Sequence, residues 1–187
     1  MFKPFLIFFL LLSQISFSQK TDVGDCRIEI YLLKKRYPSY DTVTKKMVPF
    51  TPTFEDLEDT AFIKNSELVT YTITKYSIKN KGQKRYAKQV HVAEFQYSLD
   101  QRMERLNLSV RLAKQFALVV NGQIVYGGHF LNKYVSVSPF GVNAFVNQNE
   151  IAFQYGFKGQ DPRTNKQFLD CLRNTKRLTN IKGKYGG

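Results

Sequence analysis

Hydrophobic and polar residues alternate along several short stretches of this chain, which is the period expected of β-strands with one buried face. The alternation is clearest over residues 69–74, and residues 76–78 continue the same strand after a kink. β-Branched and aromatic residues mark further strands at 27–33, 90–97, 134–138 and 150–157. Residues 116–120 and 123–126 predict a β-hairpin, because Asn121-Gly122 between them accepts the positive φ of a two-residue turn.

Two other segments have a helical pattern. Ser98 can cap a helix with Gln101 completing a capping box, and its apolar face comprises Leu99, Met103, Leu106 and Val110. A last helix opens at Asp161-Pro162, and its inner side carries Phe168, Leu169, Cys171 and Leu172. Strands and helices together predict a single α+β domain. We expect five core positions to be buried: Leu106, Phe116, Leu118, Val120 and Ile151.

The amino terminus has the pattern of a signal peptide. Lys3 precedes an apolar run over residues 5–12, which is too short to anchor the chain across a bilayer. Ser16 and Ser18 supply the small residues of a cleavage site, so residues 1–18 are predicted to be removed and 19–187 to form one exported domain, periplasmic or secreted. The alternatives are an amino-terminal core helix, which would normally show a polar face, and a lipid on Cys26, against which Asp25 argues.

Residues 38–54 form an irregular connection, because Pro38, Pro49 and Pro52 remove donors that a central strand needs. This proline-containing loop is either a binding element or a surface crossover.

The chain has two cysteines, Cys26 near the start of the predicted fold and Cys171 near its end. An oxidising compartment permits them to pair, and neither has the nearby His or Cys-x-x-Cys partner of a reactive thiol. We therefore expect one disulfide, which would tie the first strand to the last helix.

The chain has a formal net charge of +13, with clusters at 34–36, 79–88 and 173–184. This charge indicates either basic faces that are simply solvated, or a surface that binds an anionic polymer or a membrane. The candidate polyanion contacts are Lys34, Lys35, Arg36, Arg173, Lys176, Arg177, Lys182 and Lys184. The last five of these belong to a basic carboxyl-terminal helix and tail.

The capped helix, the strand 116–120, the Asn121-Gly122 turn and the returning Ile124-Val125 lie within residues 98–130. In this order they resemble the head subdomain of the first periplasmic domain of SecDF translocases, and related stand-alone exported domains. The resemblance implies a fold of helices on one face of an antiparallel sheet. It does not imply proton-driven export, because the chain lacks that family's transmembrane helices and membrane-embedded acidic residues.

No catalytic pattern stands out. His91 and His129 lack metal-ligand spacing and a neighbouring nucleophile, and the acidic cluster at 55–59 lacks the alternating ligands and the central Gly of an EF-hand loop. We expect that the protein is not an enzyme and that it binds no cofactor and no metal.

The favoured function is that of a non-catalytic module that binds an envelope or extracellular protein through its sheet face or the proline-containing loop. The alternatives are a polyanion binder that uses interleaved basic and aromatic residues, and a hydrolase in which His129 meets acidic side chains in a cleft.

Overall fold

The computed structural model describes residues 26–38, 40–41, 43, 46–47, 50–78, 86–108, 113–132, 141–156 and 160–180. The predicted signal peptide at 1–18, the predicted strand at 134–138, and Val110, Lys182 and Lys184 lie outside these ranges.

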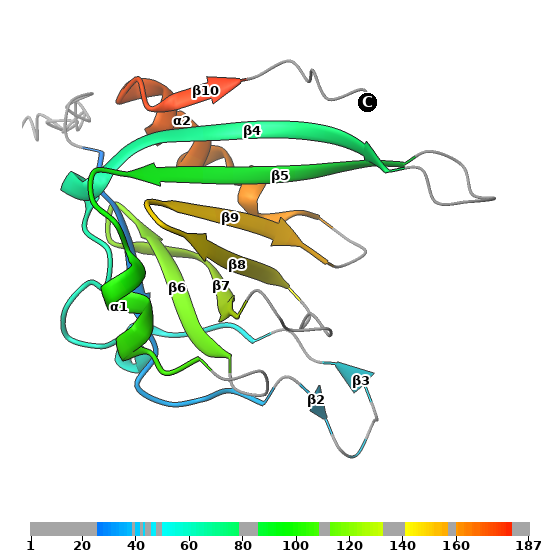
Figure 1. The fold of residues 1–187 in the computed structure, drawn as a ribbon. Coiled ribbons are helices and arrows are strands. Elements are labelled where there is room, and N and C mark those ends of the chain that lie inside the picture. Colours follow the sequence, from blue (N-terminus) through cyan, green and yellow to red (C-terminus); the bar gives the residue numbers. More distant parts are fainter. Residues whose placement is uncertain are drawn as a thin grey trace, which may run out of the picture.

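One sheet of eight strands dominates the described chain, in the order β1-β6-β7-β8-β9-β5-β4-β10 (Figure 1). Neighbouring strands are antiparallel except β7 with β8 and β4 with β10, which are parallel. The strands are β1 (Ile28–Leu32), β4 (Leu68–Ile78), β5 (Tyr86–Phe95), β6 (Lys114–Val120), β7 (Gln123–Leu131), β8 (Val142–Asn147), β9 (Glu150–Tyr155) and β10 (Leu178–Asn180). A separate two-stranded ladder, β2 (Tyr40–Asp41) with β3 (Lys46–Met47), lies within the proline-containing loop.

The helical elements are few and short. They are α1 (Asp100–Arg105), α2 (Lys166–Asn174) and the 3₁₀ turns η1 (Phe54–Asp56), η2 (Asn65–Glu67) and η3 (Pro162–Thr164).

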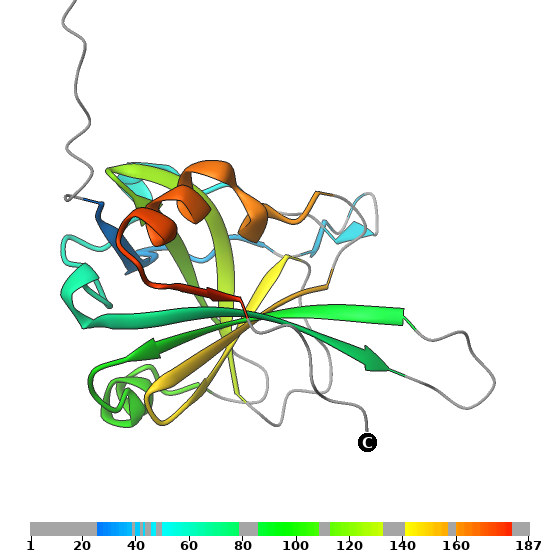
Figure 2. The ribbon, with the colours of Figure 1, turned by 90° about the horizontal axis from the view of Figure 1, so that it is seen from above.

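The sheet curls into a half-barrel around α2 (Figure 2). Phe168 of α2 lies 5.1 Å from the ring of Tyr71 in β4 and 6.4 Å from that of Tyr126 in β7, although three strands separate β4 from β7 in the sheet. The predicted antiparallel sheet with helices mainly on one face is therefore wrong. The protein is mostly β, its sheet is mixed, and its longer helix fills the concave side.

The predicted hairpin is confirmed in β6 and β7. Asn121 and Gly122 have φ of 50° and 72°, the left-handed values that a two-residue turn between twisted strands requires. A register shift between Leu118 and Val119 adds a bulge just before this turn. The Asn121 side chain also accepts a hydrogen bond from the Arg27 backbone N–H at 2.8 Å, which joins the turn to the start of β1.

The predicted helix after Ser98 is much shorter than its pattern indicates. Leu99, and not Ser98, is its N-cap, and the expected capping box with Gln101 is absent there because the Ser98 hydroxyl binds Asp100 instead. The helix ends before Asn107, whose φ is 47°. Leu106 at this end is only half-buried, so its predicted full burial is wrong.

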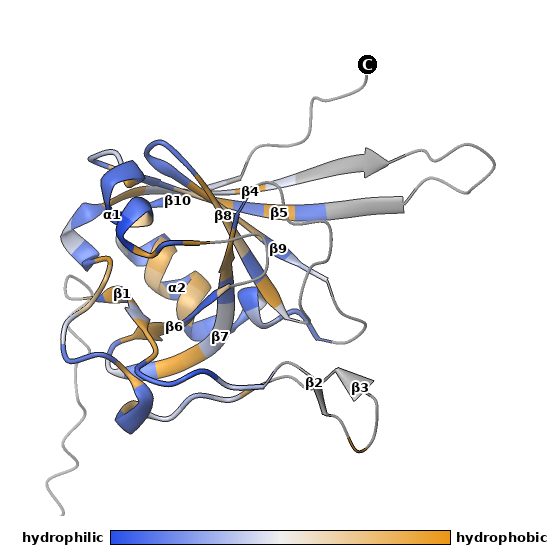
Figure 3. Ribbon diagram, turned by 60° about the horizontal axis from the view of Figure 1, so that its bottom comes forward, coloured by the Kyte–Doolittle hydropathy of each residue, from blue (hydrophilic) through white to orange (hydrophobic). Residues whose placement is uncertain are grey.

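The last helix begins in two steps. Asp161-Pro162 opens the η3 turn, as its capping pattern predicts, but α2 itself begins after Asn165, whose side chain accepts from the Phe168 N–H at 3.1 Å. The apolar positions of α2 face the strands (Figure 3), and Phe168, Cys171 and Leu172 are buried.

The predicted strand at 69–74 is one continuous strand through Ile78, and its irregularity falls between Leu68 and Thr70 instead of at the expected kink.

Four of the five predicted core residues are buried: Phe116, Leu118, Val120 and Ile151. The Phe116 ring contacts the rings of Phe130, Phe153 and Tyr126, at centroid distances of 4.7, 6.1 and 6.4 Å.

Cys26 and Cys171 form the expected disulfide, with their Cα atoms 5.5 Å apart. This separation lies within the range that a disulfide spans without moving the backbone. The bond ties the segment leading into β1 to the middle of α2.

Candidate binding groove

A groove opens where β7 and β8 separate, and its volume is about 310 Å³. Three parts of the chain line it: Phe50, Thr51 and Pro52 of the proline-containing loop; Ile124, Val125, Tyr126 and Gly127 of β7; and Gly141, Val142, Tyr155, Gln160 and Pro162 around β8, β9 and η3. We call this depression the groove. Two depressions beside α1, of about 400 and 700 Å³, are lined largely by charged and polar residues.

Strand pairing explains why the groove exists. β7 pairs with β8 only over Gly128–Leu131, while it pairs with β6 from Gln123 onward. Within the described residues, the β8-facing edge of residues 123–127 therefore has no ladder partner. Backbone N–H and C=O groups on such an edge need partners, which water or an added strand can supply.

The first wall of the groove is Phe50, which rests directly on β7. A Cβ atom at Gly127 would lie 2.6 Å from the Phe50 ring, so only glycine allows this approach. The Phe50 ring also stacks on Tyr37 at 5.5 Å and meets His129 edge-on at 5.1 Å.

A buried carboxylate holds this wall in place. Asp56 is 4% exposed and accepts hydrogen bonds from the Tyr37 hydroxyl and from the Thr53 N–H and hydroxyl, the last two at 2.8 and 2.7 Å. Lys35 pairs with the same carboxylate at 2.7 Å. The bond from Lys35, followed by those from Tyr37 and Thr53, holds the pKa of Asp56 well below its usual range. The carboxylate is thus charged and fully engaged, which fixes Tyr37 and, through it, Phe50.

The backbone of Tyr37 is fixed from the sheet side as well. The Gln115 side chain accepts from the Tyr37 N–H at 2.6 Å and donates to the Tyr37 carbonyl at 2.9 Å. Its amide nitrogen also lies 3.1 Å from His129 Nε2. Burial, with a smaller contribution from Arg36, lowers the pKa of His129 to about 4, so this ring is neutral at pH 7.

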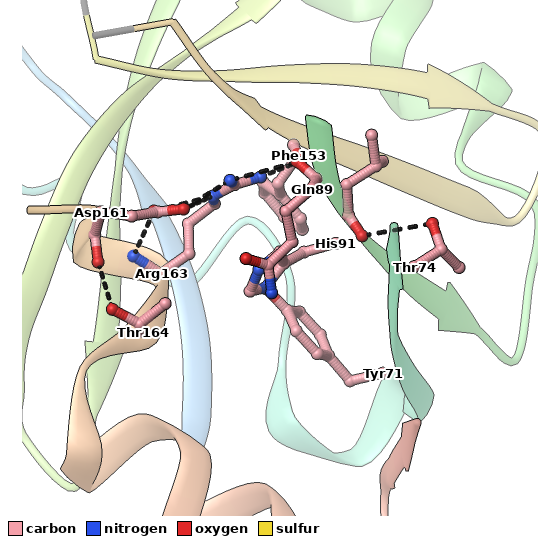
Figure 4. A network of polar contacts seen from close by, with 9 residues as sticks. Tyr71, Thr74, Gln89, His91, Phe153, Asp161, Arg163 and Thr164 are labelled. Atoms are coloured by element: carbon pink, nitrogen blue, oxygen red, sulfur yellow. Dashed lines mark hydrogen bonds and ion pairs between the residues drawn. The ribbon is translucent and has the colours of Figure 1, made fainter. Parts of the chain in front are cut away.

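The opposite wall rests on Arg163, a guanidinium that is only 2% exposed (Figure 4). Its Nε and Nη2 donate to the Asp161 carboxylate at 2.9 and 2.6 Å, its Nη1 donates to the Phe153 carbonyl at 2.5 Å, and Nη2 also reaches the Gln89 carbonyl at 3.3 Å. The guanidinium carbon lies 6.0 Å from the Tyr155 ring centroid. Arg163 therefore joins η3 to β5 and β9 and positions Tyr155 and Pro162 at the groove.

The Asp161 carboxylate remains charged in this setting. Burial alone would raise the pKa of Asp161, but the hydrogen bonds and the charge of Arg163 outweigh it and lower the pKa. An ion pair with so many hydrogen bonds satisfies the conditions under which a buried guanidinium is tolerated.

His91 and Tyr71 lie next to this ion pair, with His91 Nδ1 3.0 Å from the Tyr71 hydroxyl (Figure 4). Burial and then the charge of Arg163 lower the pKa of His91 to about 4. His91 is fully buried in the sheet, which makes it a core residue in this arrangement.

The predicted polyanion contacts are not gathered into one site. Lys34 pairs with Asp59 and Lys35 with Asp56, so part of the acidic cluster at 55–59 neutralises the first basic cluster. Lys34 and Lys35 follow the end of β1. Arg177 instead donates to Asn65 at 2.6 Å, and Asn65 in turn accepts from Ile28 at the beginning of β1.

Of the remaining predicted contacts, Arg173 pairs with Asp170 at 2.7 Å, whereas Arg36 and Lys176 are exposed. The acidic cluster also places Glu58 3.5 Å from Lys114. Across the described ranges, no group of three or more His, Cys, Asp or Glu side chains is placed to hold a metal ion.

Sequence reasoning identified the proline-containing loop but missed the residues that build the groove. Gly127-Gly128 inside a strand was the available signal, because glycine in a strand interior often marks a close backbone approach. The burial of Arg163 and Asp56 had no signal in the local sequence.

Comparisons with protein-family models, curated proteins and solved structures found no match to this chain. Of the helices that the structure describes, none has the length and apolar character needed to cross a bilayer.

Proposed function

We propose that this protein is an exported interaction module that binds an extended segment of a partner protein in the groove. The observation that carries the proposal is the edge of β7 over residues 123–127, which has no strand partner among the residues that the structure describes and opens between two apolar walls. A peptide that adds to a sheet edge gains main-chain hydrogen bonds there, and flanking pockets select its side chains.

The chemistry of the groove favours an apolar or aromatic peptide side chain between the Phe50 and Tyr155 walls. Both walls are fixed before binding, one through Asp56 and Tyr37 and the other through Arg163. Walls that are already ordered lower the entropy lost on association. The disulfide is compatible with an exported location.

The test uses a displayed library of random peptides, selected against the full chain as secreted. Gln160 is exposed and lines the groove, so Gln160→Trp should obstruct it without disturbing the core. Gln101 is also exposed, lies in α1 and does not line the groove, and Gln101→Trp is the matched control. We expect selected peptides to bind the wild type and Gln101→Trp equally, and Gln160→Trp at least about tenfold more weakly.

Amide hydrogen exchange distinguishes strand addition from other binding modes. A bound peptide should slow exchange of those amides within Ile124–Gly127 that point away from β6, because paired amides are protected. The proposal is wrong if selected peptides bind Gln160→Trp as tightly as the wild type, or if these amides are already protected in the free protein. The second result would mean that another segment of the chain occupies the edge.

A further inference from the structure

A pocket of about 400 Å³ lies between α1 and residues 58–67, the segment that leads into β4. Its base is apolar, because Leu32 is buried and Phe62 and Leu106 pack against the core. The Phe62 ring meets the Phe130 ring of β7 edge-on at 5.6 Å. We call this depression the α1 pocket. It shares no lining residue with the groove, so a ligand here is independent of the proposed function.

Both carboxylates that line the α1 pocket are already paired. The Glu67 carboxylate accepts from Nη1 of Arg102 at 3.0 Å and from Nη2 of the same guanidinium, and it also accepts from the Lys64 backbone N–H at 2.7 Å. The hydrogen bond from Arg102 outweighs burial and lowers the pKa of Glu67. Glu58 pairs with Lys114 at 3.5 Å. Neither carboxylate is therefore left to neutralise the other cations of the pocket.

Positive charge is in excess at the α1 pocket. Lys64 and Arg105 line it with exposed side chains, and neither has an ion-pair partner within the part of the chain that the structure describes. Arg105 follows Arg102 by three residues in α1, so the two guanidinium groups lie on one side of the helix. Nη1 of Arg102 donates to Phe62 and Glu67 and Nη2 to Glu67, which leaves its Nε–H and one Nη2–H without an acceptor among the described residues. The Arg102 side chain is 36% exposed, so a ligand can reach these donors.

We propose that the α1 pocket binds a ligand with one carboxylate on a short apolar body. Lys64 and Arg105 supply the compensating charge, and the planar guanidinium of Arg105 matches the two oxygens of a carboxylate. The apolar base accepts the hydrocarbon part of the ligand. The volume of the pocket lies within the range of small-molecule sites, about 300–1,000 Å³.

The lining of the α1 pocket disfavours anions of other kinds. Glu58 and Glu67 would repel the further charges of a nucleic acid or an acidic polysaccharide, and such polymers need a row of cations along their backbone. Inorganic phosphate would leave the apolar base in contact with water. A free carboxylic acid and the carboxyl terminus of a protein both have the required chemistry.

The test is an NMR titration of the isotope-labelled full chain as secreted, with octanoate and with octanamide, which has the same hydrocarbon chain without the charge. Octanoate should bind at least about tenfold more tightly and shift the amide signals of α1 and residues 58–67, because one charge-assisted hydrogen bond contributes about tenfold or more. An acetylated tripeptide that ends in leucine, as the acid and as the amide, distinguishes the two sources. Tighter binding of octanoate than of the tripeptide acid indicates a free carboxylic acid, and the reverse indicates a carboxyl terminus.

Variants locate the binding. Arg105→Gln with Lys64→Gln should weaken octanoate binding at least about tenfold. The matched control is Arg36→Gln with Lys176→Gln, two exposed residues outside the pocket that also have no ion pair among the described residues. It removes the same charge and should stay within about twofold of the wild type. Thr60→Trp, at an exposed position of the lining, should obstruct the pocket and weaken binding without a change of charge.

Several results would contradict this assignment. They are equal binding of octanoate and octanamide, wild-type binding by the Arg105→Gln with Lys64→Gln variant or by Thr60→Trp, and equal weakening by both double variants. Tighter binding of inorganic phosphate than of octanoate at the same ionic strength would contradict it as well. Urea unfolding of each variant confirms that the fold is retained, and Gln160→Trp should bind octanoate like the wild type because the groove is a separate site.

Discussion

At the residue scale, charged and titratable side chains enter the interior of this protein in two different ways. Asp56 and Arg163 are each buried beside a group of opposite charge and make several hydrogen bonds, and for Asp56 these bonds hold the pKa well below its usual range. His91 and His129 are buried with neutral hydrogen-bonding partners, Tyr71 and Gln115, and burial, followed by the charge of a nearby arginine, lowers the pKa of each to about 4. The histidines therefore make the fold sensitive to mildly acidic pH, whereas the carboxylates do so only at lower pH.

The sign of the histidine effect follows from proton binding. Each histidine has a folded pKa of about 4 and an unfolded pKa near 6.5, so the unfolded chain binds more protons between these values. Stability falls as the pH drops through this window. Going from pH 7 to pH 5 should lower the free energy of unfolding by about 2 kcal/mol for each histidine.

Urea unfolding at pH 7 and pH 5 checks this prediction. In His91→Gln, the loss of stability between the two pH values should be about 2 kcal/mol smaller than in the wild type. His129→Gln should show the same reduction. A wild-type loss below about 0.5 kcal/mol would show that both rings keep ordinary pKa values when the protein is folded.

At the element scale, the hairpin turn performs two roles through Asn121. Its backbone adopts φ of 50°, and its side chain accepts the Arg27 N–H at 2.8 Å. Asn121→Gly keeps the conformation and loses only the side-chain bond, and we expect it to cost about 0.5–1 kcal/mol. Asn121→Ala also forces a side chain into the left-handed region and should cost about 1 kcal/mol more.

Thermal or urea unfolding of both variants separates the two contributions. Equal stabilities of Asn121→Gly and Asn121→Ala would mean that the turn relaxes to a different conformation in the alanine variant. Wild-type stability in Asn121→Gly would mean that the side-chain hydrogen bond from the Arg27 N–H contributes nothing, since the backbone bond from the Asn121 N–H to the Arg27 carbonyl remains in this variant.

The elements that the sequence predicted correctly are those with local signals. The Asn121-Gly122 turn and the alternation over residues 69–74 depend on neighbouring residues and were confirmed. β8 was missed because Asn143, at an interior position with 1% exposure, interrupts its apolar pattern. β10 has three residues, too few for any period, and only its parallel pairing with β4 defines it.

At the scale of the whole molecule, the predicted fold class was wrong because its antiparallel sheet rested on the resemblance of residues 98–130 alone. That segment contains neither β8 nor β10. Both strands make parallel pairs, which depend on crossovers that sequence patterns do not specify. The groove was unpredictable for a related reason, because its walls at Phe50 and Tyr155 lie far apart in the chain and meet only after the sheet curls.

The disulfide acts at this same scale, because it joins residues 145 positions apart. In the chain-entropy model, a loop of this length restricts the unfolded chain by about 5 kcal/mol, which is an upper value when the unfolded chain retains structure. Cys26→Ala, Cys171→Ala and the double variant should therefore lose similar amounts of stability, since each removes the same bond. Urea unfolding in the absence of reductant measures these losses.

Kinetics show whether the bond acts on the unfolded state. If it does, the Cys26→Ala with Cys171→Ala variant should fold more slowly and unfold at nearly the wild-type rate, because the native contacts of α2 through Phe168 and Leu172 remain. Stopped-flow refolding and unfolding give both rates. A variant that unfolds much faster while folding at the wild-type rate would indicate that the bond instead holds α2 within the native half-barrel. In that case, binding in the groove should weaken as well, since η3 and Arg163 precede α2 directly in the chain.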